Sequence, residues 1–465
     1  MSGPGSEAQP LRVAVIGAGP TGFYATEQLL TRRELVTEVD LFDRLPTPYG
    51  LVRYGVAPDH QKIKSVTAVY DRTAAHPRFR FFGNVGYGTH LTLEDLRSHY
   101  HQIVFCTGAQ TDRQLGIPGE DLAGSYPATE FVAWYNGHPD FTGYRFDLQQ
   151  EAAAVVGIGN VAVDVARILL RSADELARTD IADYALDALR DSRVKEVHML
   201  GRRGPAQAAF TNPEIQELTE LPHADATALP EEVQLDEASR GVVERTRDHT
   251  TMKKVEILQS VAGRPPQGKP RRLILRFLVS PTELLGQDGR VQTMRLVRNR
   301  LESTSAGTVV AKATGQTEEL PTGMVFRSVG YRGVPLPGIP FNEKWGVILN
   351  EKGRILDPET KDPLAGLYTA GWIKRGATGV IGTNKPDAAE TVANMRADFA
   401  EERLLSPGQP QAADAEALIR QRQPHAVSYD DWRRLNEIEV ARGRAAGRPR
   451  VKFTRIEEML AALGR

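Results

Sequence analysis

Two glycine-rich turns, each set between a short apolar strand and a helix, constrain this chain more than any other feature. Residues 17–22 read GAGPTG, the pattern GxGxxG, and close the β-branched run 11–17. Residues 157–162 read GIGNVA, the pattern GxGxxA, and follow a similar run from residue 152. A helical pattern and a second strand come after each turn, so the sequence predicts two βαβ units. Glycines in such a turn let a pyrophosphate approach the backbone at the helix N-terminus, which indicates two dinucleotide sites.

The first of these sites has a carboxylate where a dinucleotide fold binds a ribose. A helix is predicted over 21–30 and a strand over 38–42, and Asp43 stands at the end of that strand. A carboxylate at this point accepts a ribose hydroxyl and repels a 2′-phosphate, so the site favours FAD or NAD. Its place near the N-terminus favours FAD. The alternative is that Asp43 only ends the strand as a turn residue. The predicted pyrophosphate and ribose contacts are Gly17, Ala18, Gly19, Gly22 and Asp43.

The second site has two arginines where the first has an acid. The turn glycines are Gly157 and Gly159, and the strand predicted over 194–200 runs into GRRGP. The guanidiniums of Arg202 and Arg203 can hold a 2′-phosphate by bidentate, charge-assisted bonds, which a carboxylate could not do. The sequence therefore predicts NADP(H) at this site. The other interpretation is a solvated arginine pair in a turn.

Composition limits the classes of function. The 465 residues include 58 basic and 59 acidic side chains, a net charge of −1, which argues against nucleic-acid binding and a polybasic membrane anchor. We find no apolar run of roughly 18 residues, so no integral membrane segment is predicted. Residues 1–10 lack a signal or transit pattern and are predicted to be a loose tail. A chain of this length predicts about two or three domains.

The single cysteine, Cys106, excludes several redox mechanisms. One thiol cannot form an internal disulfide, ligate an iron–sulfur cluster by itself or supply the paired thiols of a disulfide reductase. Cys106 lies in the apolar run IVFCTG, so we expect a buried and inert thiol. The cysteine content favours a reducing compartment, the cytoplasm. No metal site is predicted.

The remaining pattern predicts further elements. Residues 271–279 and 290–299 alternate as strands around LLGQDGR and predict a hairpin. A strand is expected over 366–371 and a helix over about 386–404. Beyond a linker near residue 406 the chain is charged and predicted to be helical.

Several stretches outside the glycine turns form a specific set. They are PTPYGLVRYGVAPDH (46–60), RFFGNV (80–85), GIGNVAVDVARIL (157–169), GRRGP (201–205), RSVGYRG (327–333) and GWIKRGATGVIGTNK (371–385). Together they resemble an NADPH–ferredoxin reductase of the adrenodoxin reductase type, a group that includes bacterial ferredoxin–NADP reductases. The resemblance implies an α/β fold with two Rossmann-like dinucleotide-binding domains, as in glutathione-reductase-like flavoproteins. It implies a discontinuous FAD domain, 11–111 and 333–465, with an NADP domain, 112–332, inserted in it.

The resemblance also assigns residues to the two cofactors. For FAD it implies contacts by Asp43, Leu51, Val85, Trp372, Gly379, Val380 and Ile381. For NADP it implies contacts by Gly159, Asn160, Val161, Arg202, Arg203 and Glu214. The sequence departs from the family's usual residues at Asp43, where glutamate is more common, and at Ala377, where proline is.

The resemblance implies the activity of an FAD-dependent ferredoxin–NADP+ reductase: hydride transfer from NADPH to FAD, then single-electron transfers to a ferredoxin. The ferredoxin is expected on a separate chain, and the system can serve a cytochrome P450. His60 is the candidate to tune flavin protonation, because its ordinary pKa lies near neutrality. Glu214 is its candidate partner and the implied active-site acid, so both are predicted to be catalytic. The alternatives are a capping box formed by Thr211 and Glu214, and a His60 that only packs.

A basic face toward an acidic ferredoxin is a further hypothesis, with ordinary solvated surface as the alternative. The candidate residues are Lys253, Lys254, Arg271, Arg272 and Arg276.

Two other classes of function compete with this one. A flavin-dependent NADPH monooxygenase or a diaphorase-type reductase would also have two dinucleotide folds, but the chain has the GWIKRGATGV loop and lacks a clear FxGxxxH-type segment. A non-catalytic nucleotide sensor is disfavoured because both glycine turns, the arginine pair and the flavin loops are present.

Overall fold

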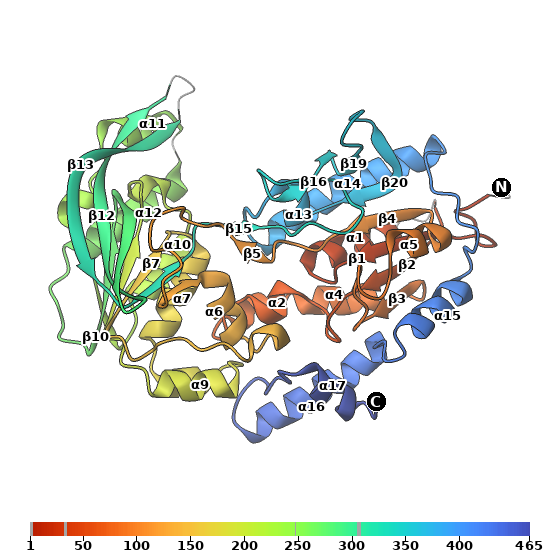
Figure 1. The fold of residues 1–465 in the computed structure, drawn as a ribbon, viewed down its shortest axis with the longest axis horizontal. Helices are drawn as coiled ribbons and strands as arrows, with labels where there is room; N and C mark the ends of the chain where they lie inside the picture. The colour runs from red at the N-terminus through yellow and green to blue at the C-terminus, as the bar shows by residue number, and fades with distance from the viewer. Residues whose placement is uncertain (1–2, 32–34, 247, 305–307) are drawn as a thin grey trace. The chain divides into compact units, whose positions relative to one another are not determined.

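The computed structural model describes residues 3–31, 35–246, 248–304 and 308–465. The chain forms two compact units (Figure 1). Unit 1 contains Met1–Thr111, Asn136–Pro139 and Tyr331–Arg465, and unit 2 contains Asp112–Tyr135 and Asp140–Gly330. Unit 1 is therefore discontinuous and is made of three stretches of the chain, one of them the short segment Asn136–Pro139. Among the described residues, no helix is long and apolar enough to cross a membrane.

Unit 1 is built on a seven-stranded sheet in the order β18-β19-β20-β4-β1-β2-β3. The strands from β20 to β3 are parallel, and β18 and β19 add an antiparallel edge. Both faces of β1 are apolar, because a parallel sheet is covered on both sides. Val13 and Val15 pack with α1, α14 and α16, whereas Ala14 and Ile16 pack with α5 and α15.

The strands of unit 1 are β1 (Leu11–Ile16), β2 (Thr37–Phe42), β3 (Phe79–Phe82), β4 (Gln102–Phe105), β16 (Phe341–Asn342), β17 (Val347–Ile348), β18 (Asn350–Glu351), β19 (Arg354–Leu356) and β20 (Pro363–Thr369). Its helices are α1 (Pro20–Leu30), α2 (Leu51–Tyr54), α3 (Gln61–Lys64), α4 (Thr67–Ala74), α5 (Leu93–His99), α13 (Trp372–Arg375), η4 (Ile381–Thr383), α14 (Asn384–Ala400), α15 (Ala412–Arg422), α16 (Tyr429–Ala445) and α17 (Ile456–Ala462). The elements β5 (Thr111–Asp112), η1 (Pro139–Phe141) and β15 (Tyr331–Arg332) lie where the chain passes between units.

Both ends of the chain are attached to unit 1. The N–H of Val36 donates to the carbonyl of Gly5, and Glu7 pairs with Arg78 at 2.6 Å. The tail predicted to be loose is thus attached over residues 3–10, and its first two residues lie outside the described part of the chain. At the other end, α16 contributes Trp432 and Leu435 to the core of the unit.

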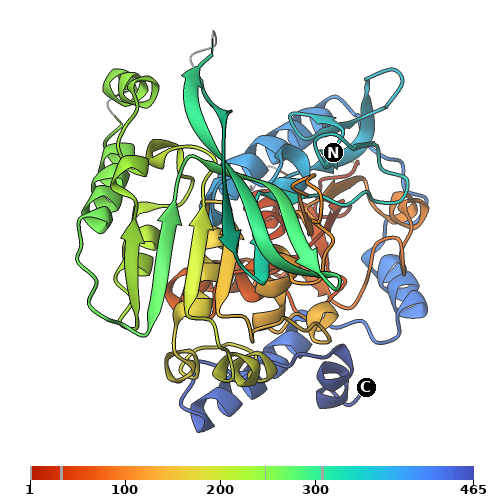
Figure 2. The same ribbon diagram turned by 60° about the vertical axis from the view of Figure 1, so that its left-hand side comes forward.

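Unit 2 has a six-stranded parallel sheet in the order β6-β14-β7-β8-β10-β9. Helices cover one face, where Ala153 and Val155 of β7 pack. An antiparallel meander, β11-β12-β13, covers the other face, where Ala154 and Val156 pack (Figure 2). The sheet therefore has helices on one side and a small second sheet on the other.

The strands of unit 2 are β6 (Ser125–Pro127), β7 (Ala152–Val156), β8 (Glu196–Leu200), β9 (Ala224–Ala228), β10 (Arg271–Arg276), β11 (Val279–Gln287), β12 (Arg290–Ser303), β13 (Val309–Pro321) and β14 (Met324–Arg327). Its helices are α6 (Ala128–Tyr135), α7 (Asn160–Leu170), α8 (Ala173–Leu176), α9 (Asp183–Arg190), η2 (Pro205–Gln207), α10 (Asn212–Thr219), η3 (Pro230–Glu232), α11 (Glu237–Thr246) and α12 (His249–Ala262).

The predicted hairpin of 271–279 with 290–299 is wrong in its first strand. Residues 271–276 form β10, which pairs in parallel with β8 and β9. The hairpin joins β11 to β12 through Asp288 and Gly289, which both have positive φ and make the tight turn. The alternation of 271–276 is therefore that of a strand inside the parallel sheet.

Candidate functional site: two dinucleotide turns

The predicted FAD residues of unit 1 gather at one edge of its sheet. The carboxyl ends of β1, β2 and β3 lead into Gly17, Asp43 and the residues before Val85. The ends of β4 and β20 lead into Cys106 and Gly371 at the same edge, since these strands are parallel. Ligands of open parallel sheets bind beyond this edge. Residues more than 300 positions apart in the sequence thus contribute to one place.

The glycine turn after β1 has the backbone that its pattern predicts. Gly17 has φ of +107°, and a Cβ there would lie 2.6 Å from the carbonyl oxygen of Cys106. The next turn glycine, Gly19, is the N-cap of α1 and would meet no atom nearer than the Cα of Gly50, at 4.0 Å. A Cβ on Gly19 would therefore be in ordinary contact with Gly50, and Gly19 opens α1 at the N-terminus where a pyrophosphate would bind.

Asp43 both shapes this turn and faces it. One carboxylate oxygen accepts from the N–H of Ala18 at 3.0 Å and the other from the N–H of Leu45 at 3.0 Å. Burial raises the pKa of the Asp43 carboxyl, and these backbone donors and Arg44 offset only part of that effect. Each oxygen keeps a further lone pair for a ribose hydroxyl. The turn-residue and ribose-ligand interpretations are therefore compatible.

A loop that crosses the turn carries Leu51. A Cβ on Gly50 would lie 3.0 Å from the Cα of Gly19, so the loop passes directly over the glycine turn. Leu51 is 36% exposed and Val380 is 49% exposed, although both are apolar. Val85 is buried, and its N–H donates to the carbonyl of Asp43 at 2.9 Å. Exposed apolar side chains beside a polar turn are what a flavin ring would cover.

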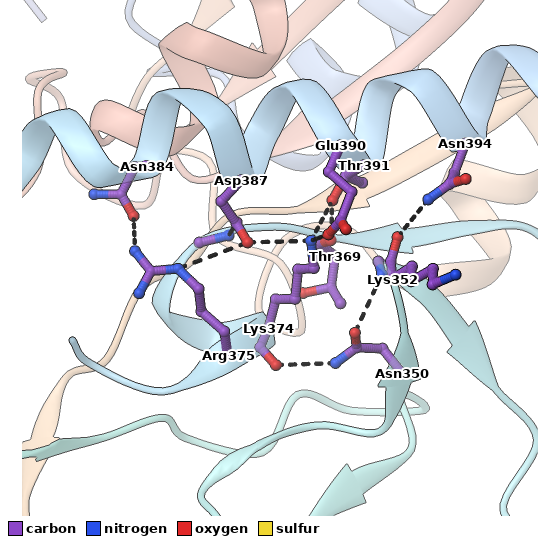
Figure 3. Close-up of polar contacts among 12 residues, drawn as sticks. Asn350, Lys352, Thr369, Lys374, Arg375, Asn384, Asp387, Glu390, Thr391 and Asn394 are labelled. Atoms are coloured by element: carbon purple, nitrogen blue, oxygen red, sulfur yellow. Dashed lines mark hydrogen bonds and ion pairs between the residues drawn. The ribbon is translucent and has the colours of Figure 1, made fainter. Parts of the chain in front are cut away.

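The loop after β20 is fixed by buried charges (Figure 3). The carboxylate of Asp387, on α14, accepts from the N–H of Gly371 at 2.5 Å and pairs with the Lys374 ammonium at 3.1 Å. Lys374 is 8% exposed and also pairs with Glu390 at 2.6 Å. Arg375 donates to the carbonyl of Thr378 at 2.8 Å. These contacts hold α13 against α14 and so define the path of the segment that contains Gly379, Val380 and Ile381.

Trp372, at the start of α13, has its own anchors. Its indole N–H donates to the carbonyl of Thr378 at 3.2 Å, and its ring lies 5.6 Å from that of Tyr331. The ring is only partly buried. It is therefore held in one orientation while one surface remains available.

The second glycine turn, in unit 2, repeats the arrangement. Gly157 has φ of +132°, and a Cβ there would lie 2.1 Å from the carbonyl oxygen of Ser328. No atom lies within 4 Å of a Cβ built on Gly159. Asn160 accepts from the N–H of Thr211 at 2.9 Å, which ties the turn to the start of α10. Val161 is partly buried in the first turn of α7.

The predicted arginine pair follows β8 in the same unit. Arg202 is exposed and Arg203 is half-buried. Among the described residues, neither guanidinium has a hydrogen-bond or ion-pair partner. Burial and the charge of Arg202 lower the pKa of the Arg203 guanidinium. Two adjacent cations without a counter-ion make a site for a dianion.

Glu214 lies on α10 of unit 2 and pairs with a buried arginine. Its carboxylate accepts from Arg167 of α7 at 3.2 Å, and Arg167 is fully buried. Arg167 also pairs with Asp164 at 2.6 Å. The capping box considered for Thr211 and Glu214 is absent, because the Thr211 side chain makes no cap hydrogen bond. His60 precedes α3 of unit 1, and its pairing with Glu214 stays a prediction.

The hypothesis of a basic face is wrong for most of its residues, because internal partners take their charges. Lys254 is 8% exposed and donates to the carbonyl of Ala208, and Arg271 donates to two carbonyls at the C-terminal end of α7. Arg276 pairs with Glu232 at 2.9 Å and also with Glu318, Arg272 pairs with Glu196, and Lys253 pairs with Glu256. The sequence could not show this for Lys254, Arg271 and Arg276, since their partners are distant along the chain. Lys253 and Arg272 stay more than half exposed and pair at the surface.

Cys106 is buried, as expected, and burial raises the pKa of its thiol. It lies at the end of β4 against the glycine turn, where a thiolate is strongly disfavoured.

Comparison with known proteins gives the family. The pattern of the pyridine nucleotide-disulphide oxidoreductase family matches residues 11–220. NADPH-ferredoxin reductase FprA of Mycobacterium tuberculosis is 45% identical over 462 residues, which cover 97% of this chain and 99% of that protein. The chain belongs to the FprA family of NADPH-ferredoxin reductases. The mitochondrial NADPH:adrenodoxin oxidoreductase of Arabidopsis thaliana is 39% identical over 98% of this chain and 96% of its own length.

A solved structure of a member of this reductase family, Mycobacterium tuberculosis FprA in complex with NADPH, superposes with a TM-score of 0.91. It is 44% identical and covers 98% of this chain and 100% of its own. This confirms the resemblance to adrenodoxin-type reductases and the predicted α/β fold with two Rossmann-like domains.

Proposed function

We propose that this enzyme is an NADPH–ferredoxin oxidoreductase that binds FAD on unit 1 and NADP(H) on unit 2. The domain assignment rests on the carboxylate beside the first glycine turn and the arginine pair beside the second. The observation that carries the proposal most directly is the pair Arg202 and Arg203, whose charges have no partner among the described residues.

Bound FAD would supply the chemistry that accepts a hydride from NADPH and passes electrons singly to an iron–sulfur protein. The chain's own residues bind and orient. Gly19 and Gly159 leave room for a pyrophosphate at two helix N-termini, and the dipoles of those helices favour its charge. Leu51 and Trp372 cover apolar ring surface and exclude water, which fixes the approach of the reacting atoms.

We further propose that His60 and Glu214 act on protons near the flavin. The Arg167 partnership supports a role for Glu214, because it holds the carboxylate in one orientation. The experiment that decides this is the pH profile of kcat for His60→Ala and Glu214→Ala.

The partner in this proposal is a ferredoxin on a separate chain, as the names of the relatives suggest, and it can stand upstream of a cytochrome P450. The single, buried thiol supports action in the reducing cytoplasm and leaves cluster chemistry to the partner.

The test of the proposal is coenzyme discrimination. Arg202→Gln and Arg203→Gln each remove one charge and its charge-assisted bonds, so we expect KM for NADPH to rise about tenfold or more, with KM for NADH nearly unchanged. Ferredoxin-dependent cytochrome reduction is the assay. A wild-type enzyme that uses NADH as well as NADPH would contradict the proposal.

A further inference from the structure

The backbone of the arginine turn is held from the meander of unit 2. The three successive carbonyls of residues 201–203 all accept hydrogen bonds from the meander or from Leu278, the residue directly before it. Val279 N donates to the first at 3.1 Å, Asn299 Nδ2 to the second at 2.9 Å, and Leu278 N to the third at 3.2 Å. Only one of these donors is a side chain, that of Asn299. A substitution of Asn299 can therefore remove its hydrogen bond, whereas the two backbone donors are present whatever the residue type.

Asn299 is placed for this contact by an irregularity in its strand. The pairing of β12 with β13 shifts register between Val297 and Asn299. The side chain is 8% exposed, and both amide hydrogens are used, because Nδ2 also donates to the Ser280 hydroxyl at 2.8 Å. A β-bulge redirects a side chain in this way, and two acceptors fix the orientation of the amide.

The neighbouring backbone is strained in a way that these bonds offset. Leu278, which joins β10 to β11, has φ of +57°, a left-handed conformation that is costly for a branched residue. Its carbonyl accepts from the N–H of Asn299 at 2.7 Å, and its own N–H is the donor to Arg203. The meander and the arginine turn are thus one hydrogen-bonded unit rather than two adjacent loops.

We propose that Asn299 is a positioning residue for coenzyme specificity: it fixes the carbonyl of Arg202 and thereby orients both guanidiniums toward a 2′-phosphate. The inference rests on the proposed function, because it requires that Arg202 and Arg203 bind that group. Adjacent guanidiniums repel each other, and an unsupported turn would let them separate. A fixed backbone keeps both directed at one dianion.

The experiment uses the FAD-loaded enzyme and the variant Asn299→Ala. The Arg202 carbonyl then loses its partner, so we expect KM for NADPH to rise about tenfold, while kcat and KM for NADH change less than about twofold. Thr282→Ala is the matched control, because Thr282 donates to the carbonyl of Arg295 at 3.2 Å in the same meander, away from the irregularity between Val297 and Asn299. We expect this control to leave both KM values unchanged.

A second variant and a second readout keep the test decisive if Asn299→Ala folds poorly. Asn299→Leu fills the same space without donors. Calorimetric binding of 2′,5′-ADP against 5′-AMP measures the 2′-phosphate contribution without turnover. Loss of preference for 2′,5′-ADP in either variant supports the inference, and equal loss for both nucleotides overturns it, since that is the signature of a structural role alone.

Failure of the inference and failure of the proposed function give different results. Should Arg202→Gln and Arg203→Gln lower NADPH preference while Asn299 variants keep it, only the positioning role is wrong. Should the arginine variants themselves keep full preference for NADPH, the proposed 2′-phosphate site is wrong as well.

Discussion

A buried ion pair joins α16 to α2, the short helix that begins with Leu51, and its removal gives the sharpest stability prediction. The Glu439 side chain is 0% exposed and that of Arg53 4% exposed, and two bonds join them at 2.5 and 2.8 Å. Glu439 also accepts from Arg450 at 3.3 Å and from the N–H of Phe453 at 2.9 Å. Arg53 lies over the ring of Trp432 at 5.1 Å. One carboxylate therefore satisfies four donors from three residues.

Glu439→Gln removes the charge but keeps the shape. The glutamine amide places its own donors against a guanidinium that stays buried, so we expect the free energy of unfolding of unit 1 to fall by about 3–5 kcal/mol. Urea titration of the FAD-loaded protein, followed by flavin fluorescence, measures it. Glu437→Gln is the control, because Glu437 is exposed on the same helix, and it should change stability by no more than about 0.5 kcal/mol. Since Arg53 lies on α2 together with Leu51, we also expect Glu439→Gln to retain less FAD on gel filtration.

The same pair predicts a dependence on pH. Burial alone would raise the pKa of Glu439, but Arg53 and Arg450 outweigh it and hold the pKa below 4.5, its ordinary value. A lowered pKa in the folded state means that this stabilisation is present above pH 4.5 and is lost as the pH falls through the lower, folded-state pKa. The difference between the wild type and Glu439→Gln should therefore shrink on acidification. A loss under about 1 kcal/mol at pH 7 would refute the reasoning, because it is what an exposed pair contributes.

Further variants test the two cofactor sites. Gly157→Ala should fail to fold, or should melt at a much lower temperature in circular dichroism, because its methyl group would clash with the backbone. Gly159→Ala should melt like the wild type, because its methyl group points into open space, but it should raise KM for NADPH about tenfold. Asp43→Asn should weaken FAD binding about tenfold in a fluorescence titration, since the ribose loses a charged acceptor. His60→Ala and Glu214→Ala should shift the pH profile of kcat, and unchanged rates and profiles in both would show that neither moves a proton.

The sequence was sufficient for features that depend on local spacing. Both glycine turns and the arginine pair follow their strands within a few residues, so a βαβ pattern predicts their positions directly. The resemblance then predicts an FAD domain that is interrupted by residues 112–332, and the assignment of a cofactor to each part stays a prediction. The ribose contact of Asp43 stays a prediction, and the hydrogen bonds that its carboxylate makes to the glycine turn needed the structure.

Contacts between distant residues were not predictable. Arg53 and Glu439 are 386 positions apart, and Asn299 is 97 positions from Arg202. No local pattern marks Glu439 as buried, because an acid on a charged helix is usually solvated. The strand over 271–276 was assigned to the hairpin because alternation does not show which strand pairs with it. Lys254 and Arg276 looked like open charge for the same reason.

The most direct test of the account is anaerobic titration of the purified, yellow protein with NADPH and, separately, NADH. We predict that about one equivalent of NADPH bleaches the flavin absorbance, that NADH at the same concentration bleaches it far more slowly, and that a ferredoxin restores the colour. A colourless protein that takes up no FAD, or a flavin that NADPH leaves oxidised, would contradict the account.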